Sequence, residues 1–352
     1  MPLSRPVPLS VLDLAPVTDG STPGEALQRS TELAQRAEAW GYERYWVAEH
    51  HNMPGIASAA PAVLIAHLAA ATTTLRLGSG GVMLPNHAPL VVAEQFGMLE
   101  ALHPGRIDLG LGRAPGTDQL TAAALRRRLA PESPGGDDFP QLLGEMLGFF
   151  NDAWPEGHPY QQIHATPARG NQPAIWLLGS SGYSAQVAGL LGLPFAFAHH
   201  FSSENTEPAL HLYRDCFRPS AVLAEPYALV GVAVVCADTT ERARWLHGSS
   251  KLSMLRLRTG RPGPLPRPEE AAGYSFTPSE KVTVERATGS HVVGDLDTVT
   301  AGLDDLLART DADELMITTN VWDHGERLHS FELLAELIPS PAPAAGTRAV
   351  TR

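Results

Sequence analysis

Two adjacent histidines, His50 and His51, follow the short apolar run Arg44–Ala48. A histidine at the end of a strand can act as a general base or a hydrogen-bond donor near neutral pH. Adjacent side chains of an extended segment point to opposite faces, so only one of the two can face a central cavity. The alternative is a structural histidine with satisfied hydrogen bonds, which the residues alone favour.

A glycine cluster, Gly78-Ser79-Gly80-Gly81, lies at the end of the next apolar run, Leu75–Val82. Glycine weakens the interior of a strand, so this cluster indicates either a close approach of the backbone or a positive φ angle. The flat face of a ring-shaped cofactor needs such a bare backbone surface. An ordinary β-bulge is the alternative.

The segment 105–116, GRIDLGLGRAPG, invites comparison with the glycine-rich dinucleotide-binding motif. Gly110 and Gly112 follow a predicted strand, but Pro115 stands where the third glycine belongs and no helix opens there, so we reject that motif. The more useful residue is Arg113, because its planar guanidinium suits a phosphate group. A surface ion pair with a neighbouring acid such as Asp118 is the alternative.

The turn Gly179-Ser180-Ser181-Gly182 joins the apolar run Ala174–Leu178 to a helix that we expect to begin near Tyr183. The N-terminus of a helix presents unpaired N–H groups and a partial positive charge, and serine hydroxyls add further donors. This turn is therefore a candidate anion site. Either serine could instead be a simple N-cap, and both roles can coexist.

Five further residues are weaker candidates, because none has a spacing that requires a role. They are Asp13, Asn86, His87, His199 and His200, all expected near the C-terminal ends of strands. Of these we assign Asp13, at the end of the first strand, to the cofactor-binding set.

Strand-like apolar runs alternate with helical patterns along the chain. The runs are Leu9–Leu14, Arg44–Ala48, Leu75–Val82, Ile107–Leu111, Ala174–Leu178, Pro194–Ala198, Ala228–Cys236 and Glu314–Thr318. The main helices are expected at Pro23–Trp40, Pro61–Thr72, Pro89–Leu102, Asp138–Phe150, Tyr183–Leu191, Glu207–Phe217, Thr240–Leu257 and Glu326–Leu337, with a short one at Asp297–Leu307. Eight alternations predict an α/β fold, a (β/α)8 TIM barrel with loop insertions at its C-terminal face, where reactive groups collect. A doubly wound sheet is the alternative.

We expect a single barrel domain over residues 1–338. Two segments break the alternation: residues 112–137, which contain the helical-looking TAAALRRRLA, and residues 258–281, which are rich in Pro and Gly. Long loops at the mouth of a barrel are often lids, and we expect residues 258–281 to be one. A disordered surface insertion is the alternative. The tail, residues 339–352, is expected to be disordered.

The composition limits the classes of partner. The chain has 352 residues, 43% of them hydrophobic, and a net charge of −12, which would repel nucleic acid and anionic membranes. No apolar run reaches the ~18 residues that span a bilayer. Two cysteines without metal-like spacing, and a start without a continuous apolar signal segment, predict a cytoplasmic protein.

Four blocks of sequence together resemble the bacterial luciferase-like flavin monooxygenases: SVLDLAPV, RYWVAEHHNMPG, LRLGSGGVMLPNHAPLVVAEQ and LEALHPGRIDLGLGRAPG. The similarity runs from about Leu9 to Leu337 and is densest over residues 40–118. It implies an enzyme that takes reduced FMN from a separate flavin reductase and uses O2 to oxidise a small organic substrate through a flavin hydroperoxide. It also implies a homodimer, for which the Ala-rich segment Ala57–Thr73 is our candidate helix. Packing of that helix inside a monomer is the alternative.

The resemblance also assigns roles to individual residues. His50 matches the catalytic histidine of the family, and Gly80–Gly81 matches a non-proline cis peptide behind the flavin ring. Arg113, Ser180 and Tyr183 match the residues that hold the flavin phosphate.

The other residues of the phosphate turn, Gly179, Ser181 and Gly182, belong to the same predicted site. Two positions depart from bacterial luciferase: Gly179 replaces an acidic residue, and Gly112 replaces a cysteine. We therefore do not predict light emission.

Three other functions stay open at the level of sequence. The same fold could use the deazaflavin F420 for hydride transfer without O2, or it could bind a flavin without catalysis. A metal-dependent barrel hydrolase needs ligand pairs such as HxH or HExxH, and the sequence has neither.

Overall fold

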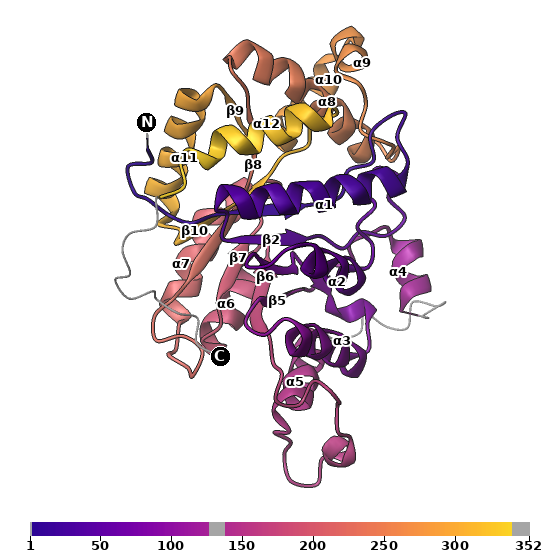
Figure 1. The fold of residues 1–352 in the computed structure, drawn as a ribbon, viewed down its shortest axis with the longest axis vertical. Coiled ribbons are helices and arrows are strands. Elements are labelled where there is room, and N and C mark those ends of the chain that lie inside the picture. Colours follow the sequence, from indigo (N-terminus) through magenta and orange to yellow (C-terminus); the bar gives the residue numbers. More distant parts are fainter. Residues whose placement is uncertain (1, 127–137, 340–352) are drawn as a thin grey trace.

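The computed structural model of the protein describes residues 2–126 and 138–339. Within these residues, eight parallel strands close into a barrel in the order β10–β1–β2–β3–β5–β6–β7–β8, and β8 pairs back onto β10 (Figure 1). They are β1 (Leu9–Asp13), β2 (Arg44–Val47), β3 (Arg76–Ser79), β5 (Ile107–Gly112), β6 (Ala174–Gly179), β7 (Phe195–Phe197), β8 (Ala228–Cys236) and β10 (Glu314–Thr318). The predicted (β/α)8 barrel is confirmed.

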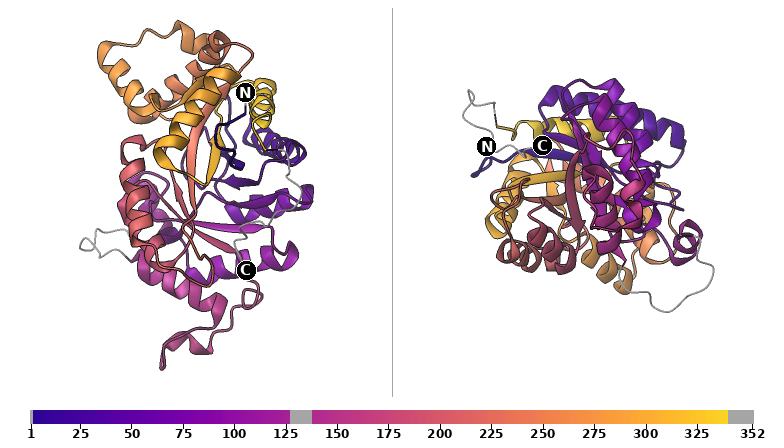
Figure 2. Two further views of the ribbon diagram at one scale, coloured as in Figure 1. Left: turned by 90° about the vertical axis from the view of Figure 1, so that its left-hand side faces the viewer. Right: turned by 90° about the horizontal axis from the view of Figure 1, so that it is seen from below.

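Helices surround the strands (Figure 2). The main ones are α1 (Pro23–Trp40), α2 (Pro61–Ala71), α3 (Pro89–Leu102), α5 (Phe139–Asn151), α6 (Gly182–Leu191), α7 (Thr206–Cys216), α8 (Thr240–Arg258), α11 (Leu296–Thr310) and α12 (His324–Ala335). The ends of the eight main predicted helices lie within two residues of the observed ends. In Figure 1 the segment that follows α5 extends away from the barrel at the opposite end from α8.

Local signals explain why the helix ends could be predicted. The Thr22 side chain and Glu25 form a capping box at the start of α1, and a proline occupies its first turn. Gly41 ends the same helix at φ +85°, a left-handed conformation that glycine adopts without a steric penalty.

Two short strands extend the barrel wall. β4 (Val82–Met83) follows β3 after a break at Gly80–Gly81 and pairs with β5. β9 (Val292–Gly294) pairs with the C-terminal part of β8. The single strand predicted over Leu75–Val82 is therefore two strands.

The side chains that point into the barrel fill its interior in layers. In the middle layer Leu12, Trp46, Trp176, Leu229 and Met316 pack together and are almost completely buried. This layer fills the barrel, so a ligand can approach only from an end.

The N-terminal end of the barrel is closed by a buried ionic cluster. The Arg44 guanidinium lies 2.8 Å from the Asp108 carboxylate and 2.7 Å from that of Glu314. Trp46 Nε1 donates to Asp108, and the Tyr227 hydroxyl donates to Glu314. Burial alone would raise the pKa of Asp108, but the positive charges of Arg44 and its neighbour Arg76 lower the pKa below its usual value. The open end is therefore the C-terminal rim.

The predicted lid, residues 258–281, is more regular than its composition indicates. It contains α9 (Pro268–Gly273) and the start of α10 (Pro278–Thr288). The Leu265 N–H donates to the Val17 carbonyl, and the Asp19 N–H donates to the Leu265 carbonyl, both at 2.8 Å. Backbone pairing thus fixes this segment to the loop after β1, and its action as a lid stays a prediction.

The other interrupting segment contains a short helix, α4 (Gln119–Leu125). The last four residues of TAAALRRRLA and almost all of the tail that we expect to be disordered lie outside the described residues, in the ranges 127–137 and 340–352. Of that tail the structure describes only Pro339. No helix in the described part of the chain is both long and apolar enough to cross a membrane.

Candidate active site at the C-terminal rim of the barrel

The parallel barrel brings most of the predicted residues to one rim. His50 follows β2, the Gly80–Gly81 peptide separates β3 from β4, and Arg113 follows β5. The serine turn, Ser180-Ser181, follows β6 directly and precedes α6. Segments that are far apart in the sequence thus meet at the same end of the fold.

His50 is held in one tautomer by its surroundings. Its Nδ1 lies 3.2 Å from the Gly116 carbonyl oxygen, which can only accept, so Nδ1 carries the proton and Nε2 keeps its lone pair. Burial lowers the pKa of His50 below the ordinary value. A neutral imidazole whose Nε2 keeps its lone pair is suited to accept a proton near neutral pH.

Glu49, which the sequence analysis did not single out, organises this part of the rim. Its buried carboxylate accepts hydrogen bonds from His51 Nε2 and His87 Nε2, both at 2.8 Å, and from the Met83 N–H at 3.0 Å. His51 therefore has a structural partner, and His50 stays the predicted catalytic histidine. The sequence contains one sign of this role: Glu49 stands between the predicted strand Arg44–Ala48 and two adjacent histidines.

The Gly80–Gly81 peptide bond is cis, as the resemblance implies. A Cβ added at Gly80 would lie 2.7 Å from Leu12, and one at Gly81 would lie 2.7 Å from the Gly110 carbonyl oxygen. A Cβ at Gly110 would lie 2.1 Å from the Ser79 carbonyl oxygen. The glycines therefore permit a close approach of β3 to β5, one of the two explanations predicted, and contact with a ring cofactor stays a prediction.

Arg113 and Tyr183, which are far apart in the sequence, are in contact. The Arg113 guanidinium lies 4.3 Å from the centre of the Tyr183 ring, a cation–π arrangement. Asp118, the ion-pair partner considered for Arg113, instead caps α4 through the Thr121 N–H and accepts from Asn52. Arg113, which follows β5, and Tyr183 of α6 are both predicted to hold the phosphate, and they lie together at the rim.

The N-terminus of α6 lies in the same place and has no side-chain cap. Ser181 occupies the N-cap position, but its hydroxyl makes no capping hydrogen bond. Gly179 allows the helix to start this close to the strand, since a Cβ there would lie 2.8 Å from Ser184 Cβ. A Cβ at Gly182 would lie 3.0 Å from Leu212. A helix N-terminus without a side-chain cap is a candidate anion site.

The position of Asp13 requires a correction to the predicted set of cofactor-binding residues. Its carboxylate is completely buried outside the barrel wall, where it accepts hydrogen bonds from Arg327 at 2.7 Å and from the Tyr45 hydroxyl at 2.6 Å. Because side chains alternate along a strand, Leu12 points into the barrel and Asp13 points away from it. We therefore remove Asp13 from the cofactor-binding set.

The remaining weaker candidates have structural partners. Asn86 donates to the Pro115 carbonyl, and His199 pairs with the Thr206 hydroxyl at 2.8 Å. His200 Nδ1 lies 3.2 Å from the Gly231 carbonyl oxygen, and burial lowers its pKa to about 4. The described residues contain no group of three or more His, Cys, Asp or Glu side chains arranged to hold a metal ion.

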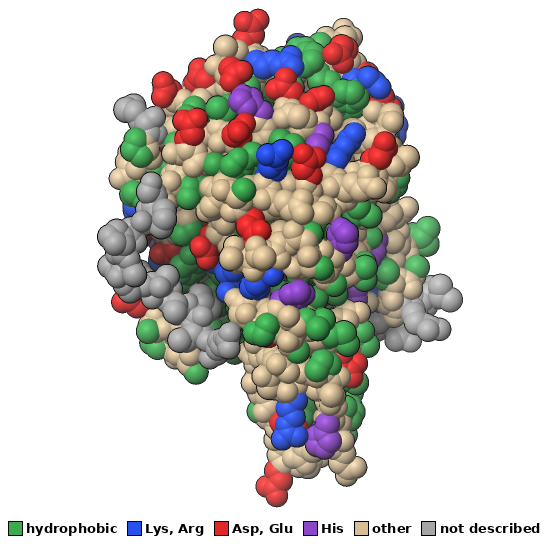
Figure 3. All heavy atoms as spheres, in the orientation of Figure 1, with side chains coloured by type: hydrophobic (Ala, Val, Ile, Leu, Met, Phe, Trp, Pro, Cys, Tyr) green, Lys and Arg blue, Asp and Glu red, His purple; other side chains and the backbone are tan. Residues whose placement is uncertain are grey.

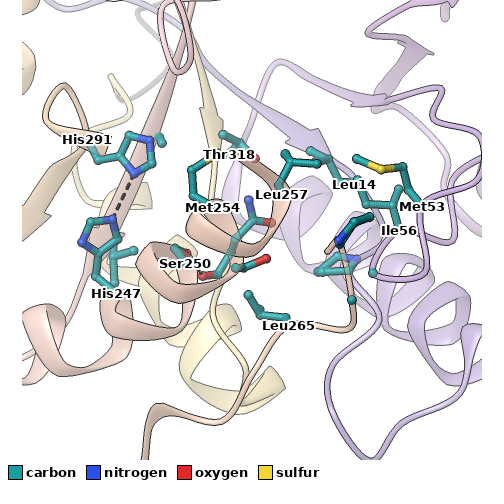
Figure 4. Close-up of a pocket in the computed structure, with 18 of the residues that line it drawn as sticks. Leu14, Met53, Ile56, His247, Ser250, Met254, Leu257, Leu265, His291 and Thr318 are labelled. Carbon is teal, nitrogen blue, oxygen red and sulfur yellow. Dashed lines mark hydrogen bonds between the residues drawn. The ribbon is translucent and has the colours of Figure 1, made fainter. Parts of the chain in front are cut away.

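Beside this rim lies a mostly apolar cavity that the sequence analysis did not find. It encloses about 890 Å³ of empty space, counted with its open mouth. Figure 4 shows Leu14, Met53 and Ile56 facing Met254 and Leu257 of α8 across it. The loop after β2 carries His50 and also contributes Met53 and Ile56 to the cavity wall, so one loop connects the candidate base to the cavity.

Solved structures of more distant proteins share the fold. The FMN complex of the oxygenating constituent of 3,6-diketocamphane monooxygenase from Pseudomonas putida is 19% identical, with a TM-score of 0.68 over 94% of this chain and 98% of that one. An F420-dependent secondary alcohol dehydrogenase is 13% identical, with the same TM-score over 96% and 100%. Both kinds of cofactor therefore occur on this architecture.

More similar proteins identify the family. A luciferase-like monooxygenase of Escherichia coli strain K12 is 50% identical over 95% of this chain and 97% of its own. The N-acetyl-S-alkylcysteine monooxygenase of Bacillus subtilis is 36% identical over 94% and 98%. The crystal structure of apo-MsnO8 is 38% identical, with a TM-score of 0.82 over 94% and 98%. The family model described as luciferase-like monooxygenase matches residues 7–314, and the chain belongs to this family.

Proposed function

We propose that the protein is an FMN-dependent monooxygenase that receives reduced FMN from a separate flavin reductase and oxidises a small organic substrate with O2. The observation that carries the proposal is the layout of the rim. An anion site formed by Arg113, Tyr183 and the start of α6 lies at the same end of the barrel as a neutral base and an apolar cavity. This layout suits a cofactor with a charged tail and a reactive ring.

The residues of the rim fit the phosphate of FMN. The hydroxyls of Ser180 and Ser181 make no hydrogen bond within the described part of the chain, and the α6 N-terminus lacks a side-chain cap. Together with the Arg113 guanidinium they would hold a phosphate dianion through charge-assisted hydrogen bonds. When bound, reduced FMN supplies the electrons that activate O2.

The chain itself contributes a proton acceptor and an apolar enclosure. His50 Nε2 would accept a proton from the substrate or from water held beside it, while Nδ1–H donates to Gly116. The cavity walls exclude water, which strengthens electrostatic interactions in the site and protects reactive species from hydrolysis.

An oxygenation assay tests the proposal directly. The protein is mixed with photoreduced FMN and aerated buffer in the presence of panels of ketones, aldehydes, thioethers and aromatic compounds. We expect an oxygenated product from at least one panel, detected by mass spectrometry with 18O2. No labelled product from any panel would refute the oxygenase assignment.

F420-dependent hydride transfer is the second candidate, because an F420 enzyme shares the fold. Parallel titrations with FMN and F420 separate the two cofactors. Tight binding of F420 alone, with reduction of a substrate under anaerobic conditions, would favour the second candidate.

Replacing Arg113 by Met tests the phosphate site. We expect FMN affinity to fall about 10- to 100-fold, because a charge-assisted hydrogen bond contributes roughly 1.5–3 kcal/mol. Riboflavin lacks the phosphate, so its affinity should stay nearly unchanged. Fluorescence titration of both ligands measures the two effects, and Arg218→Met on the exposed surface is the control. Equal losses for FMN and riboflavin would contradict a phosphate role.

We also propose that the protein forms a homodimer through α2 and α3. The outer surfaces of these helices expose large apolar side chains: Val63 is 70% exposed, Met98 52% and Leu102 65%. Figure 3 shows hydrophobic side chains gathered on the face over these helices. Contiguous exposed apolar surface marks an interaction site more often than isolated residues do.

The double substitution Val63→Glu with Leu102→Glu should convert the dimer to a monomer. Burying two carboxylates in an apolar interface raises the dimer dissociation constant by roughly 100-fold or more. Size-exclusion chromatography with light scattering measures the mass, and Leu120→Glu on α4 is the control, since Leu120 is 82% exposed. A wild-type protein that is monomeric at micromolar concentration would contradict the proposal.

A further inference from the structure

The apolar cavity beside the rim has walls without formal charge. In the described part of the chain, none of the side chains that line it belongs to Asp, Glu, Lys or Arg. A charged ligand group would therefore lose its hydration there without gaining an ionic partner, which is costly. An uncharged group would not suffer this loss.

Two histidines in the wall are neutral and locked in position. His291 Nε2 lies 3.3 Å from the His200 carbonyl oxygen, so Nε2 carries the proton and Nδ1 accepts. His247 Nε2 then donates to His291 Nδ1 at 3.0 Å, the dashed line in Figure 4. Burial lowers the pKa of His247 to about 3 and that of His291 to about 4, and the nearby positive charge of Lys251 acts in the same direction. Neither histidine offers a positive charge to a carboxylate at neutral pH.

The inner end of the cavity carries an unused hydrogen-bonding group. Thr318 ends β10, pairs with Ala233 of β8 and is only 4% exposed, yet its buried hydroxyl has no hydrogen-bond partner within the described residues. Buried hydroxyls without a partner are uncommon in folded proteins. Asn320, two residues further along, also lines the cavity, and its carbonyl accepts from the Ser250 hydroxyl.

The mouth of the cavity is apolar. Leu257, at the end of α8, is 39% exposed, and Leu265 is held over the cavity by its backbone pairing with Val17. Gly55 lies against this roof, since a Cβ there would lie 2.4 Å from the Gly263 carbonyl oxygen. A ligand that fills the cavity thus meets apolar groups at the mouth and, at the inner end, a Thr318 hydroxyl that has no other partner among the described residues.

We propose that the cavity binds an uncharged, predominantly apolar substrate whose hydrogen-bond acceptor, such as a carbonyl oxygen, receives the Thr318 hydroxyl, and that it rejects carboxylates. This inference rests on the proposed function, because it names the substrate class of that site. It assigns Thr318 and the uncharged walls as determinants of specificity, and it places the polar end of the substrate at the barrel and its apolar remainder towards Leu257 and Leu265.

Binding measurements with matched probes test this inference. 2-Decanone, decanoate and decylammonium have similar chains and differ in the charge of the head group. Isothermal titration at pH 7.5, with and without saturating oxidised FMN, should give at least about ten-fold tighter binding of the ketone than of either ion. Equal or tighter binding of decanoate would overturn the inference, and so would the absence of ketone binding under both conditions.

Two substitutions locate the ligand. Thr318→Val removes a hydroxyl that has no partner in the described part of the chain, so it should leave the fold intact and weaken ketone binding about 3- to 10-fold, the contribution of one hydrogen bond. Leu257→Lys places a positive charge at the mouth and should tighten decanoate binding relative to the ketone. Val282→Lys is its control, because Val282 is 55% exposed on α10 and does not line the cavity. Unchanged ketone affinity in Thr318→Val would refute the role of that hydroxyl.

The outcome is separable from that of the proposed function, because these titrations need neither reduced FMN nor turnover. Ketone binding that depends on Thr318, without any oxygenated product, would leave the binding site intact and refute the monooxygenase assignment. Oxygenation of carboxylates in preference to neutral compounds would support the monooxygenase assignment and refute the inferred substrate class.

Discussion

Replacing His50 by Asn should lower the rate of substrate oxygenation about 10²- to 10⁴-fold, the usual contribution of a general base. Asparagine Nδ2 can still donate to the Gly116 carbonyl, as His50 Nδ1 does, but the variant has no equivalent of Nε2. Stopped-flow turnover with reduced FMN and O2 measures the loss. FMN affinity should change little, since the proposed phosphate site lies elsewhere, after β5 and at the start of α6.

The matched control for this variant is His211→Asn, which changes an exposed histidine of α7. It should retain full activity. Full activity of His50→Asn, by contrast, would support the alternative of a flavin-binding protein in which this histidine has no catalytic part.

The pH dependence gives an independent check on His50. Burial lowers its pKa, so the neutral, proton-accepting form persists to lower pH than in an ordinary histidine. The acidic limb of kcat/KM should therefore lie below about pH 6.5, the ordinary histidine pKa, and it should be absent from the residual activity of His50→Asn. A limb above that pH would assign the titration to another group.

The second large effect concerns stability. Replacing Arg44 by Met should destabilise the protein by about 3–5 kcal/mol, because it leaves the buried carboxylates of Asp108 and Glu314 without their shared positive partner. Urea unfolding followed by tryptophan fluorescence measures the change in the free energy of unfolding.

Arg309→Met is the matched control, since Arg309 also pairs with two carboxylates, Glu207 and Asp305, but on the exposed surface. Exposed ion pairs contribute roughly 0–1 kcal/mol, so this variant should differ little from the wild type. Equal losses in the two variants would show that burial of the Arg44 cluster adds nothing.

Much of the fold could be predicted from local signals in the sequence. Prolines at the start of α1, α2 and α3 and the left-handed Gly41 set helix boundaries, and apolar runs marked all eight barrel strands. Parallel strands then place their C-terminal ends together, so the neighbourhood of His50, Arg113 and the serine turn followed from topology.

The directions of individual side chains were harder to predict. Asp13 was assigned to the cofactor although Leu12 and Leu14, on either side of it, point inwards, and strict alternation sends Asp13 outwards. The part played by Glu49 depends on His87, a contact across 38 residues of sequence that no local pattern reveals. The Pro-rich composition of residues 258–281 concealed α9 and α10, which begin at prolines that suit a first turn.

The cavity could not be predicted, because its walls come from the loops after β1 and β2, from β8, α8 and β10, and from the loop before α9. Most of the side chains that they contribute resemble ordinary core residues in the sequence. Only the closed barrel brings them together, and only burial shows that the Thr318 hydroxyl lacks a partner among the described residues.

The rim is built from two groups of segments: residues 49–118 and 179–183 supply the candidate base and the candidate anion site, whereas α8 and residues 262–265 supply much of the cavity. Mutations in the second group of segments can therefore alter which molecules are bound while the residues of the first group stay unchanged. During evolution, changes in α8 and in residues 262–265 can therefore broaden the range of substrates. Protein engineering can use the same two segments for this purpose.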